Sequence, residues 1–382
     1  MRTAYVHGTV LANGRLQKGL AVLVENGLVR EVSPLEQMSL TGCDTIDIDG
    51  QFLLPGFIDV QVNGGGGVLF NDTPTVDGIR TIAEAHSRFG TTGLLPTLIS
   101  DGLDVVQRGL AAVTEAIEAG TPGVLGIHIE GPFLNVERRG VHDAGKLQKL
   151  TRKIISSLQP LENGPTVLTV APETLEPGMV RELSEKGFLV CAGHSNANYE
   201  QVCDAISQGL RGFTHLFNAM SQLGSREPGM VGAALDSEAA WAGIIADGHH
   251  VSNASLRSAY RCKGPEKLML VSDAMPPVGS EDDRFTLLGN PVTVKSGVCV
   301  DANGTLAGTA LDMATALRTM MQASGCRLEE ASIMASFAPA RFLGLENRLG
   351  RIEPGFSADF AVLDSRLNTV QTVIAGKPAW PR

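Results

Sequence analysis

The middle of the chain alternates short apolar runs with helical stretches, and this alternation limits the possible folds more than any other feature. Eight runs fit buried parallel strands, which are continuously apolar: 57–64, 91–99, 124–132, 166–173, 188–195, 212–220, 242–250 and 268–275. Helical patterns lie between several of them, as at 76–89, 103–119 and 198–210. Such an α/β alternation, repeated eight times, predicts a TIM-like (β/α)8 barrel.

Both ends of the chain look β-rich instead. Residues 1–54 hold short β-prone runs broken by Asn-Gly, Asn-Gly and Asp-Gly turns, and residues 348–382 hold "SADFAVLD" and "VQTVIAGKPAW". We expect the two ends to pair into one small β-sandwich domain, formed by 1–54 plus 345–382, with the barrel over 55–344. A chain of 382 residues is long enough for both parts.

Composition and charge exclude several classes of protein. Hydrophobic residues make up 43% and charged residues 19% of the chain, as in packed globular proteins. The net charge of −10 argues against nucleic acid or an anionic membrane as the main partner, but leaves a small anionic substrate open. There is no apolar run of roughly 18 residues and no signal-peptide pattern, and the six cysteines are scattered. We expect a soluble, cytoplasmic protein with reduced cysteines.

Polar and ionisable residues recur at the C-terminal ends of the predicted strands, where the active sites of such barrels lie. They are Gln61, Asn63, Glu130, Glu173, His194, His215, His249, His250 and Asp273. Chance would scatter them along the strands. Their common position predicts a reaction site at the barrel mouth.

Glu130, His194 and His215 follow the third, fifth and sixth strands. Taken singly, each is more often a turn or surface residue, and Glu130 before Gly-Pro can simply cap a helix. Together they make a ligand set for one catalytic divalent metal that leaves a fourth position for water. We expect zinc, although Fe²⁺, Mn²⁺ and Co²⁺ suit the same donors.

Asp273 ends the eighth strand and can reach across the barrel mouth. A metal can lower the pKa of bound water to about 7, so a nearby carboxylate can accept its proton and later protonate a leaving group. The alternative is a structural aspartate that caps the following "AMPP" turn. The neighbouring metal ligands favour the catalytic interpretation.

Eight stretches in this order resemble the N-acetylglucosamine-6-phosphate deacetylases of the amidohydrolase superfamily: "PGFIDVQVNGGGG", "HIEGPFLN", "AGHSNA", "THLFNAM", "REPG", "IIADGHHV", "VSDAM" and "NGTLAGT". The tail "GRIEPGFSADFAVLD" resembles the closing β segment of the superfamily. The likeness spans essentially the whole chain. It implies a metal-dependent hydrolase that removes acetate from N-acetylglucosamine 6-phosphate, and it implies a homodimer.

The resemblance also implies roles for single residues. Glu130, His194 and His215 match the metal ligands, and Asp273 matches the general base and acid. His142 matches a histidine that contacts the sugar and polarises the acetamide carbonyl. The remaining matches are substrate contacts, some of them supplied across the dimer, with Arg226 and His250 at the phosphate: Val141, Asn218, Ala219, Arg226, His250, Leu306, Ala307 and Gly308.

The first strand departs from the superfamily pattern. Many amidohydrolases bind two metals through a His-x-His pair here and often a lysine on the fourth strand, whereas this chain has Gln61-x-Asn63 and no such lysine. A neutral amide is a poor substitute for imidazole, so we expect one metal per subunit. Gln61 and Asn63 then support a water near the metal or only stabilise the loop.

Three points stay open in the sequence. The substrate could be another phosphorylated N-acetyl sugar, such as N-acetylgalactosamine 6-phosphate, because nothing in the sequence reads the orientation of the 4-hydroxyl group. A non-catalytic scaffold is a further alternative, and the missing His-x-His pair is its only support. Adjacent strand residues point to opposite faces, so one of His249 and His250 faces the site, and the family match favours His250.

Overall fold

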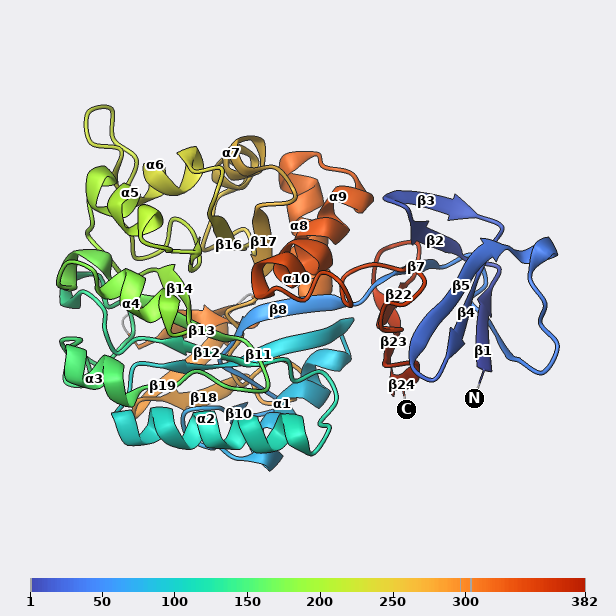
Figure 1. Ribbon diagram of the computed structural model, residues 1–382, viewed down its shortest axis with the longest axis horizontal. Coiled ribbons are helices and arrows are strands. Elements are labelled where there is room, and N and C mark those ends of the chain that lie inside the picture. Colours follow the sequence, from blue (N-terminus) through green and yellow to red (C-terminus); the bar gives the residue numbers. More distant parts are fainter. Residues whose placement is uncertain (1, 296, 303, 382) are drawn as a thin grey trace.

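The computed structural model describes residues 2–295, 297–302 and 304–381. Its larger part is a barrel of eight parallel strands, which follow one another in sequence order around the sheet (Figure 1). These strands are β8 (Phe57–Val62), β11 (Thr91–Ile99), β12 (Ile127–Glu130), β13 (Thr166–Val170), β14 (Leu189–Ala192), β15 (Gly212–Phe213), β16 (Trp241–Ile245) and β17 (Leu268–Val271). The predicted (β/α)8 barrel is confirmed. Most strands end sooner than predicted, because the polar residues after them form loops.

Helices surround the barrel and supply much of its core. They are α1 (Val76–Ser87), α2 (Leu103–Glu118), α3 (Arg152–Ser157), α4 (Met179–Glu185), α5 (Tyr199–Ser207), α6 (Gly229–Asp236), α7 (Asn253–Lys263), α8 (Met313–Ser324), α9 (Leu328–Ser332), α10 (Ala338–Leu343), the 3-10 turns η1 (Leu35–Gln37), η2 (Val136–Arg138) and η3 (Pro172–Thr174), and the π-helix η4 (Ile333–Phe337). Helix α5 begins at a capping box of Asn198 and Gln201, which satisfies two otherwise unpaired backbone N–H groups. No helix of the described ranges is both long and apolar enough to cross a membrane.

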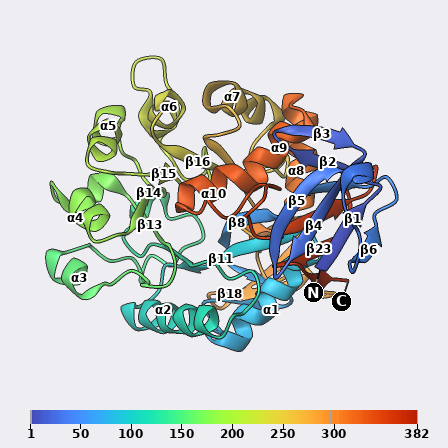
Figure 2. The ribbon, with the colours of Figure 1, turned by 45° about the vertical axis from the view of Figure 1, so that its right-hand side comes forward.

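The chain ends form a separate small β-sandwich beside the barrel, with both termini on it (Figures 1 and 2). One sheet holds β1 (Arg2–Val6), β4 (Leu20–Glu25), β5 (Leu28–Pro34) and β6 (Asp44–Asp47); the other holds β2 (Thr9–Ala12), β3 (Arg15–Lys18), β7 (Phe52–Pro55), β22 (Phe360–Leu363), β23 (Thr369–Ile374) and β24 (Lys377–Trp380). Strands β7 and β22 pair antiparallel and so join the two ends. Tyr5 and Phe360 pack edge to face across the sandwich, 5.3 Å between ring centroids. The exact domain boundaries stay a prediction.

A four-stranded sheet follows the last barrel strand and was not predicted. It comprises β18 (Arg284–Leu287), β19 (Asn290–Lys295), β20 (Val298–Asp301) and β21 (Leu306–Thr309). Its apolar face packs against Leu69, Ile99 and Met275 at the barrel mouth, next to the short hairpin of β9 (Gly64–Gly65) and β10 (Val68–Leu69). This inserted sheet therefore forms one wall of the mouth.

The seam between the first and last barrel strands is held differently from the others. Strands β8 and β17 form no regular ladder; an isolated bridge joins Val62 to Ala274, just beyond β17. The Asp273 N–H donates to the Gln61 carbonyl at 3.0 Å, and the Asn63 N–H donates to the Ala274 carbonyl at 2.9 Å. Barrel closure thus runs directly through polar residues at the mouth.

Candidate active site

Glu130, His194 and His215 meet at the barrel mouth, all three buried. Glu130 Oε1 lies 2.9 Å from His194 Nε2 and 2.8 Å from His215 Nε2. The two Nε2 atoms are 3.0 Å apart. The C-terminal ends of three different strands therefore bring one oxygen and two nitrogen atoms to a common point.

The donor set fits a divalent cation. The His194 Nδ1–H donates to the Arg138 carbonyl at 2.8 Å, which leaves the lone pair of the neutral ring on Nε2, facing the cluster. A second imidazole nitrogen and a carboxylate oxygen at about hydrogen-bond distance concentrate negative potential there, which a shared cation relieves. Burial alone would raise the pKa of Glu130, but the neighbouring His194 and His215 side chains outweigh burial and hold the pKa well below its usual range.

Three residues at the barrel mouth share an unusual backbone geometry. His194, His215 and Asp273 all have positive φ, at 48°, 34° and 52°. Non-glycine residues rarely adopt this region, and such strain concentrates at functional sites. Each of these residues lies two positions beyond the end of its strand, so the left-handed backbone falls where the chain turns at the barrel mouth.

Asp273 lies beside the cluster and is hydrogen-bonded to the first strand. Its Oδ1 accepts from Asn63 Nδ2 at 2.7 Å and from Gln61 Nε2 at 3.1 Å. Burial, followed by the negative charge of Glu130, raises the pKa of Asp273 to about 6. A carboxyl group with such a pKa can both accept and donate a proton near neutral pH.

His142 reaches the same place from the loop after η2. Its Nδ1 lies 3.2 Å from the Ser100 backbone N and 2.7 Å from Ser100 Oγ. Burial lowers the pKa of His142 to about 3, so the ring is neutral. The site therefore has a neutral imidazole opposite a carboxylate.

A cavity of about 170 Å³ joins these groups. Most of the predicted site residues line it: Asn63, Glu130, Val141, His142, His194, His215, Asn218, Ala219, His250, Asp273, Leu306 and Gly308. Gln61 lies behind the wall, 1% exposed, bonded to both carboxylates. Ala307 faces an adjoining cavity of about 510 Å³ between the 139–144 loop and the inserted sheet.

Arg226 does not line the cavity of its own chain. It is exposed on the loop before α6. Its predicted phosphate contact therefore stays a prediction, because the structure describes a single chain.

The backbone N–H of Asn218 already has a partner within the chain. It donates to the His215 carbonyl at 3.0 Å, so it is not free to donate to a substrate.

The two adjacent histidines separate as the family match favoured. His250 lines the cavity, and His249 is exposed. Strand alternation is not the reason, because β16 ends at Ile245 and both histidines lie in a turn. Asp247 sets the turn instead: its Oδ1 accepts both backbone N–H groups, and its Oδ2 lies 2.6 Å from His250 Nδ1.

Several cavity residues escaped the sequence reasoning. Ile99, Ile245 and Met275 are apolar and give no chemical signal in a sequence, yet each lines the cavity. Ser100 and Asp247 were missed as well; Ser100 contacts His142, and Asp247 contacts His250. Asp247 could have been predicted more easily than Ser100, because it lies three residues before His250 and an Asx turn is a common motif.

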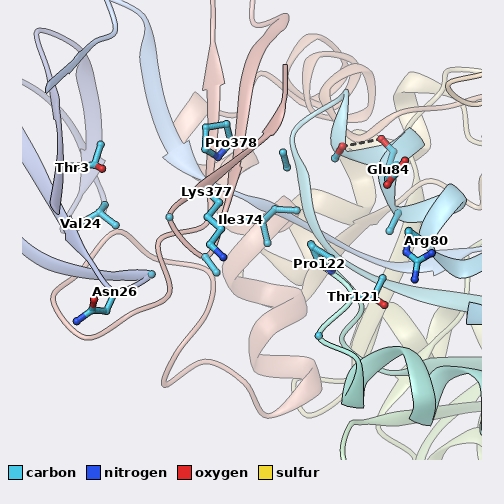
Figure 3. A pocket seen from close by; sticks show the side chains of 17 residues that line it. Thr3, Val24, Asn26, Arg80, Glu84, Thr121, Pro122, Ile374, Lys377 and Pro378 are labelled. Atoms are coloured by element: carbon cyan, nitrogen blue, oxygen red, sulfur yellow. Dashed lines mark hydrogen bonds between the residues drawn. The ribbon is translucent and has the colours of Figure 1, made fainter. Parts of the chain in front are cut away.

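A larger cavity, about 730 Å³, lies where the small β-sandwich meets the barrel (Figure 3). Its walls include Val24, Pro122 and Ile374, and its ionisable side chains are Arg80, Glu84 and Lys377. These groups include no histidine or cysteine to complete a metal or nucleophile site. We therefore place the reaction at the barrel mouth.

Comparison with known proteins agrees with this geometry. The amidohydrolase family matches residues 52–379. The chain is 41% identical to an N-acetylgalactosamine-6-phosphate deacetylase of Shewanella sp. over 96% of this chain and 93% of the relative. It is 34% identical to an N-acetylglucosamine-6-phosphate deacetylase of Haemophilus influenzae over 99% of both chains. A crystal structure of N-acetylglucosamine-6-phosphate deacetylase from Pasteurella multocida superposes with a TM-score of 0.95 and 33% identity, over 99% of both chains. The chain therefore belongs to the amidohydrolase family.

Proposed function

We propose that this protein hydrolyses the acetamide of N-acetyl-D-glucosamine 6-phosphate to give D-glucosamine 6-phosphate and acetate. The observation that carries the proposal is the meeting of a Glu-His-His cluster, the Asp273 carboxyl group and a neutral histidine in one cavity. The relatives that match this chain over nearly their full length are named as deacetylases of N-acetylhexosamine 6-phosphates.

Glu130, His194 and His215 hold one divalent ion per subunit in this proposal, zinc by default, with Fe²⁺, Mn²⁺ or Co²⁺ as alternatives. When bound, such an ion polarises a carbonyl and makes water nucleophilic at neutral pH. The orientation of the Gln61 and Asn63 amides favours one bound ion rather than two. Each turns its N–H side toward a carboxylate, and an N–H group donates hydrogen bonds rather than binding a metal.

In this proposal Asp273 carries out the proton transfers, and His142 binds the carbonyl oxygen of the acetamide. Asp273 accepts a proton from the attacking water and later donates it to the amine nitrogen as the C–N bond breaks. His142 donates to the acetamide oxygen, where negative charge develops in the transition state. Val141, Ala219, Leu306 and Gly308 line the cavity around this centre.

The phosphate is held by His250 and Arg226 in this proposal. His250 lines the cavity and is oriented by Asp247. Arg226 is exposed in its own chain, so we propose a homodimer in which it reaches the cavity of the partner subunit. A guanidinium binds two phosphate oxygens at once and suits this role.

N-acetylgalactosamine 6-phosphate is the second candidate substrate. It is favoured by the 41% identity to a relative of that name, which exceeds the 34% to the Haemophilus enzyme. The two sugars differ only at C4, away from the acetamide and the phosphate. The same catalytic groups would therefore serve either sugar.

Acetate release from three sugars tests both candidates. The purified protein, with its metal content measured, is given N-acetylglucosamine 6-phosphate, its galactose epimer and unphosphorylated N-acetylglucosamine. We expect a kcat/KM for a 6-phosphate at least 100-fold above that for the free sugar, a loss of about 2.7 kcal/mol of transition-state binding. The ratio between the two epimers identifies the preferred sugar. Metal-loaded protein that releases no acetate from either phosphate would overturn the proposal.

A further inference from the structure

Two buried primary amides bind the two carboxylates of the active site. Gln61 Nε2 lies 3.0 Å from Glu130 Oε2 and 3.1 Å from Asp273 Oδ1, so one NH₂ group joins both. Asn63 Nδ2 lies 2.7 Å from the same Asp273 Oδ1. Both amides are essentially buried, at 1% and 0% exposure, so water does not compete for these hydrogen bonds.

These contacts give each carboxylate oxygen a separate task. Glu130 Oε1 faces His194 and His215, while Oε2 is held by Gln61. Asp273 Oδ1 is held by both amides, which leaves Oδ2 as the oxygen that can exchange a proton. The shared NH₂ group also separates two carboxylates that would otherwise repel each other.

The backbone at the barrel seam fixes the same groups. Asp273 and Gln61 are joined by their main chains as well as their side chains, and Asn63 is joined to Ala274. The Ser272 N–H also donates to Asp59 Oδ1, at 3.3 Å, and Asp59 lies two residues before Gln61 on β8. Main-chain and side-chain hydrogen bonds together thus replace the missing ladder where Asp273 must be held.

We propose that Gln61 and Asn63 are positioning residues that orient Asp273 for proton transfer and hold Glu130 so that only Oε1 faces the two histidines. This inference rests on the proposed function, because Asp273 must move a proton for its orientation to matter. It assigns a task to the two amides that stand where a second metal's His-x-His ligands would be.

Asn63→Leu tests the proposal through its coupling to Asp273. Leucine has a similar shape but no donor, and Asn63 Oδ1 is buried without a partner among the described residues, so little hydrogen bonding is lost beyond Asp273. We expect kcat to fall by roughly 10- to 100-fold, as for other groups that orient a catalytic residue, with KM within about threefold. In an Asp273→Asn background the same change should cost less than about twofold, because there is no general base left to position.

Gln61→Met tests the second half of the proposal with a readout independent of turnover. We expect it to lose metal to a chelator at roughly 10- to 100-fold lower chelator concentration than wild type, because Glu130 is no longer held. Gln208→Met is the matched control: it removes an amide that bonds Asp204 on the outside of α5 and should change neither metal retention nor kcat.

The outcomes separate this inference from the proposed function. Wild-type protein inactive on both sugar phosphates would overturn the proposed function, whereas wild-type metal retention in Gln61→Met would overturn the role at Glu130. With an active wild type, a normal kcat in Asn63→Leu would overturn the role at Asp273. An equal loss in the wild-type and Asp273→Asn backgrounds would do the same, since it would show a structural effect only.

Discussion

Ser100 and His142 are joined through a single imidazole nitrogen. His142 Nδ1 lies 3.2 Å from the Ser100 backbone N and 2.7 Å from the Ser100 hydroxyl. A backbone N–H can only donate, so Nδ1 must be the acceptor and the proton of the neutral ring must be on Nε2. His142 therefore offers a permanent N–H donor at the cavity, where a carbonyl oxygen would acquire negative charge.

His142→Phe removes this donor while keeping a ring of similar size. We expect kcat to fall by roughly 100- to 1,000-fold, the usual cost of one donor to a developing oxyanion. Ser100→Ala should cost much less, because the backbone N–H that fixes the tautomer remains. Steady-state kinetics of both variants checks the order. A Ser100→Ala enzyme as impaired as His142→Phe would show that the hydroxyl, rather than the backbone, fixes the ring.

Asp273→Asn should abolish proton transfer and leave the site otherwise intact. The asparagine keeps an oxygen for the Gln61 and Asn63 amides but cannot accept the proton of an attacking water. We expect kcat to fall by roughly 100- to 10,000-fold, with substrate affinity and metal content unchanged. Turnover near the wild-type rate would remove Asp273 from the mechanism.

Metal removal should cost both activity and stability. The Glu130–His194–His215 cluster is buried, and without a cation its close-packed nitrogens and carboxylate are poorly compensated. Zinc at 1,000 times its Kd adds about 4 kcal/mol to the free energy of unfolding of a protein that binds it only when folded. We expect chelator to lower Tm and abolish acetate release, and added Zn²⁺ to restore both.

Glu130→Gln is the control for that experiment. It should bind little metal, so chelator and zinc should leave its Tm almost unchanged. If chelator lowers the Tm of Glu130→Gln as much as that of wild type, the stabilising ion lies at another site.

The barrel was predictable because its signals are local. Each buried parallel strand is a continuous apolar run, and Thr91–Ile99 matches its prediction residue for residue. The inserted sheet was missed because its strands are half exposed and carry mixed patterns: β18 and β19 lie on no continuous apolar run. Such strands depend on packing against Met275 and its neighbours rather than on their own sequence.

The Glu130–His194–His215 cluster was predictable for a similar reason, whereas the residues that support the site were not. Glu130, His194 and His215 are chemically distinctive residues at equivalent places in the barrel, so one rule locates all three. Ser100 acts on His142 from 42 residues away, and the amides of Gln61 and Asn63 reach Asp273 across more than 200 residues. Only the folded barrel brings these pairs together.

The proposed homodimer makes a prediction that a monomer cannot satisfy. If Arg226 serves the partner's cavity, Arg226→Ala and Asp273→Asn homodimers are each impaired, but a mixed dimer has one site with both groups intact. In a random mixture of the two variants, about a quarter of all sites should be competent, by the two-fold symmetry of the dimer. Co-expression with two tags, purification of the mixed dimer and an acetate assay test this. A mixed dimer with no recovered activity would place Arg226 outside the partner's site.

Gly308 lies in the cavity wall on β21, and its φ of 65° favours glycine. An added Cβ would lie 2.6 Å from two atoms of Met275 and 3.0 Å from the Asp273 carbonyl oxygen. Gly289, in the hairpin between β18 and β19, has a similar φ of 81°, but a Cβ there would have nothing within 4 Å. The two glycines therefore share the backbone strain of an alanine substitution and differ in the steric clash.

Comparing the two alanine variants separates the effect of backbone strain from the effect of displacing the cavity wall. Gly289→Ala should cost about 1 to 2 kcal/mol of stability for its left-handed backbone and leave kcat/KM unchanged. Gly308→Ala should cost more stability and lower kcat/KM by roughly 10- to 100-fold, because Met275 and the Asp273 main chain must move. Denaturant unfolding and kinetics on both variants measure the two effects side by side. The prediction fails if Gly308→Ala keeps full activity and is as stable as Gly289→Ala. In that case the β21 wall can move without disturbing Asp273, and the inserted sheet is not needed to hold the catalytic geometry.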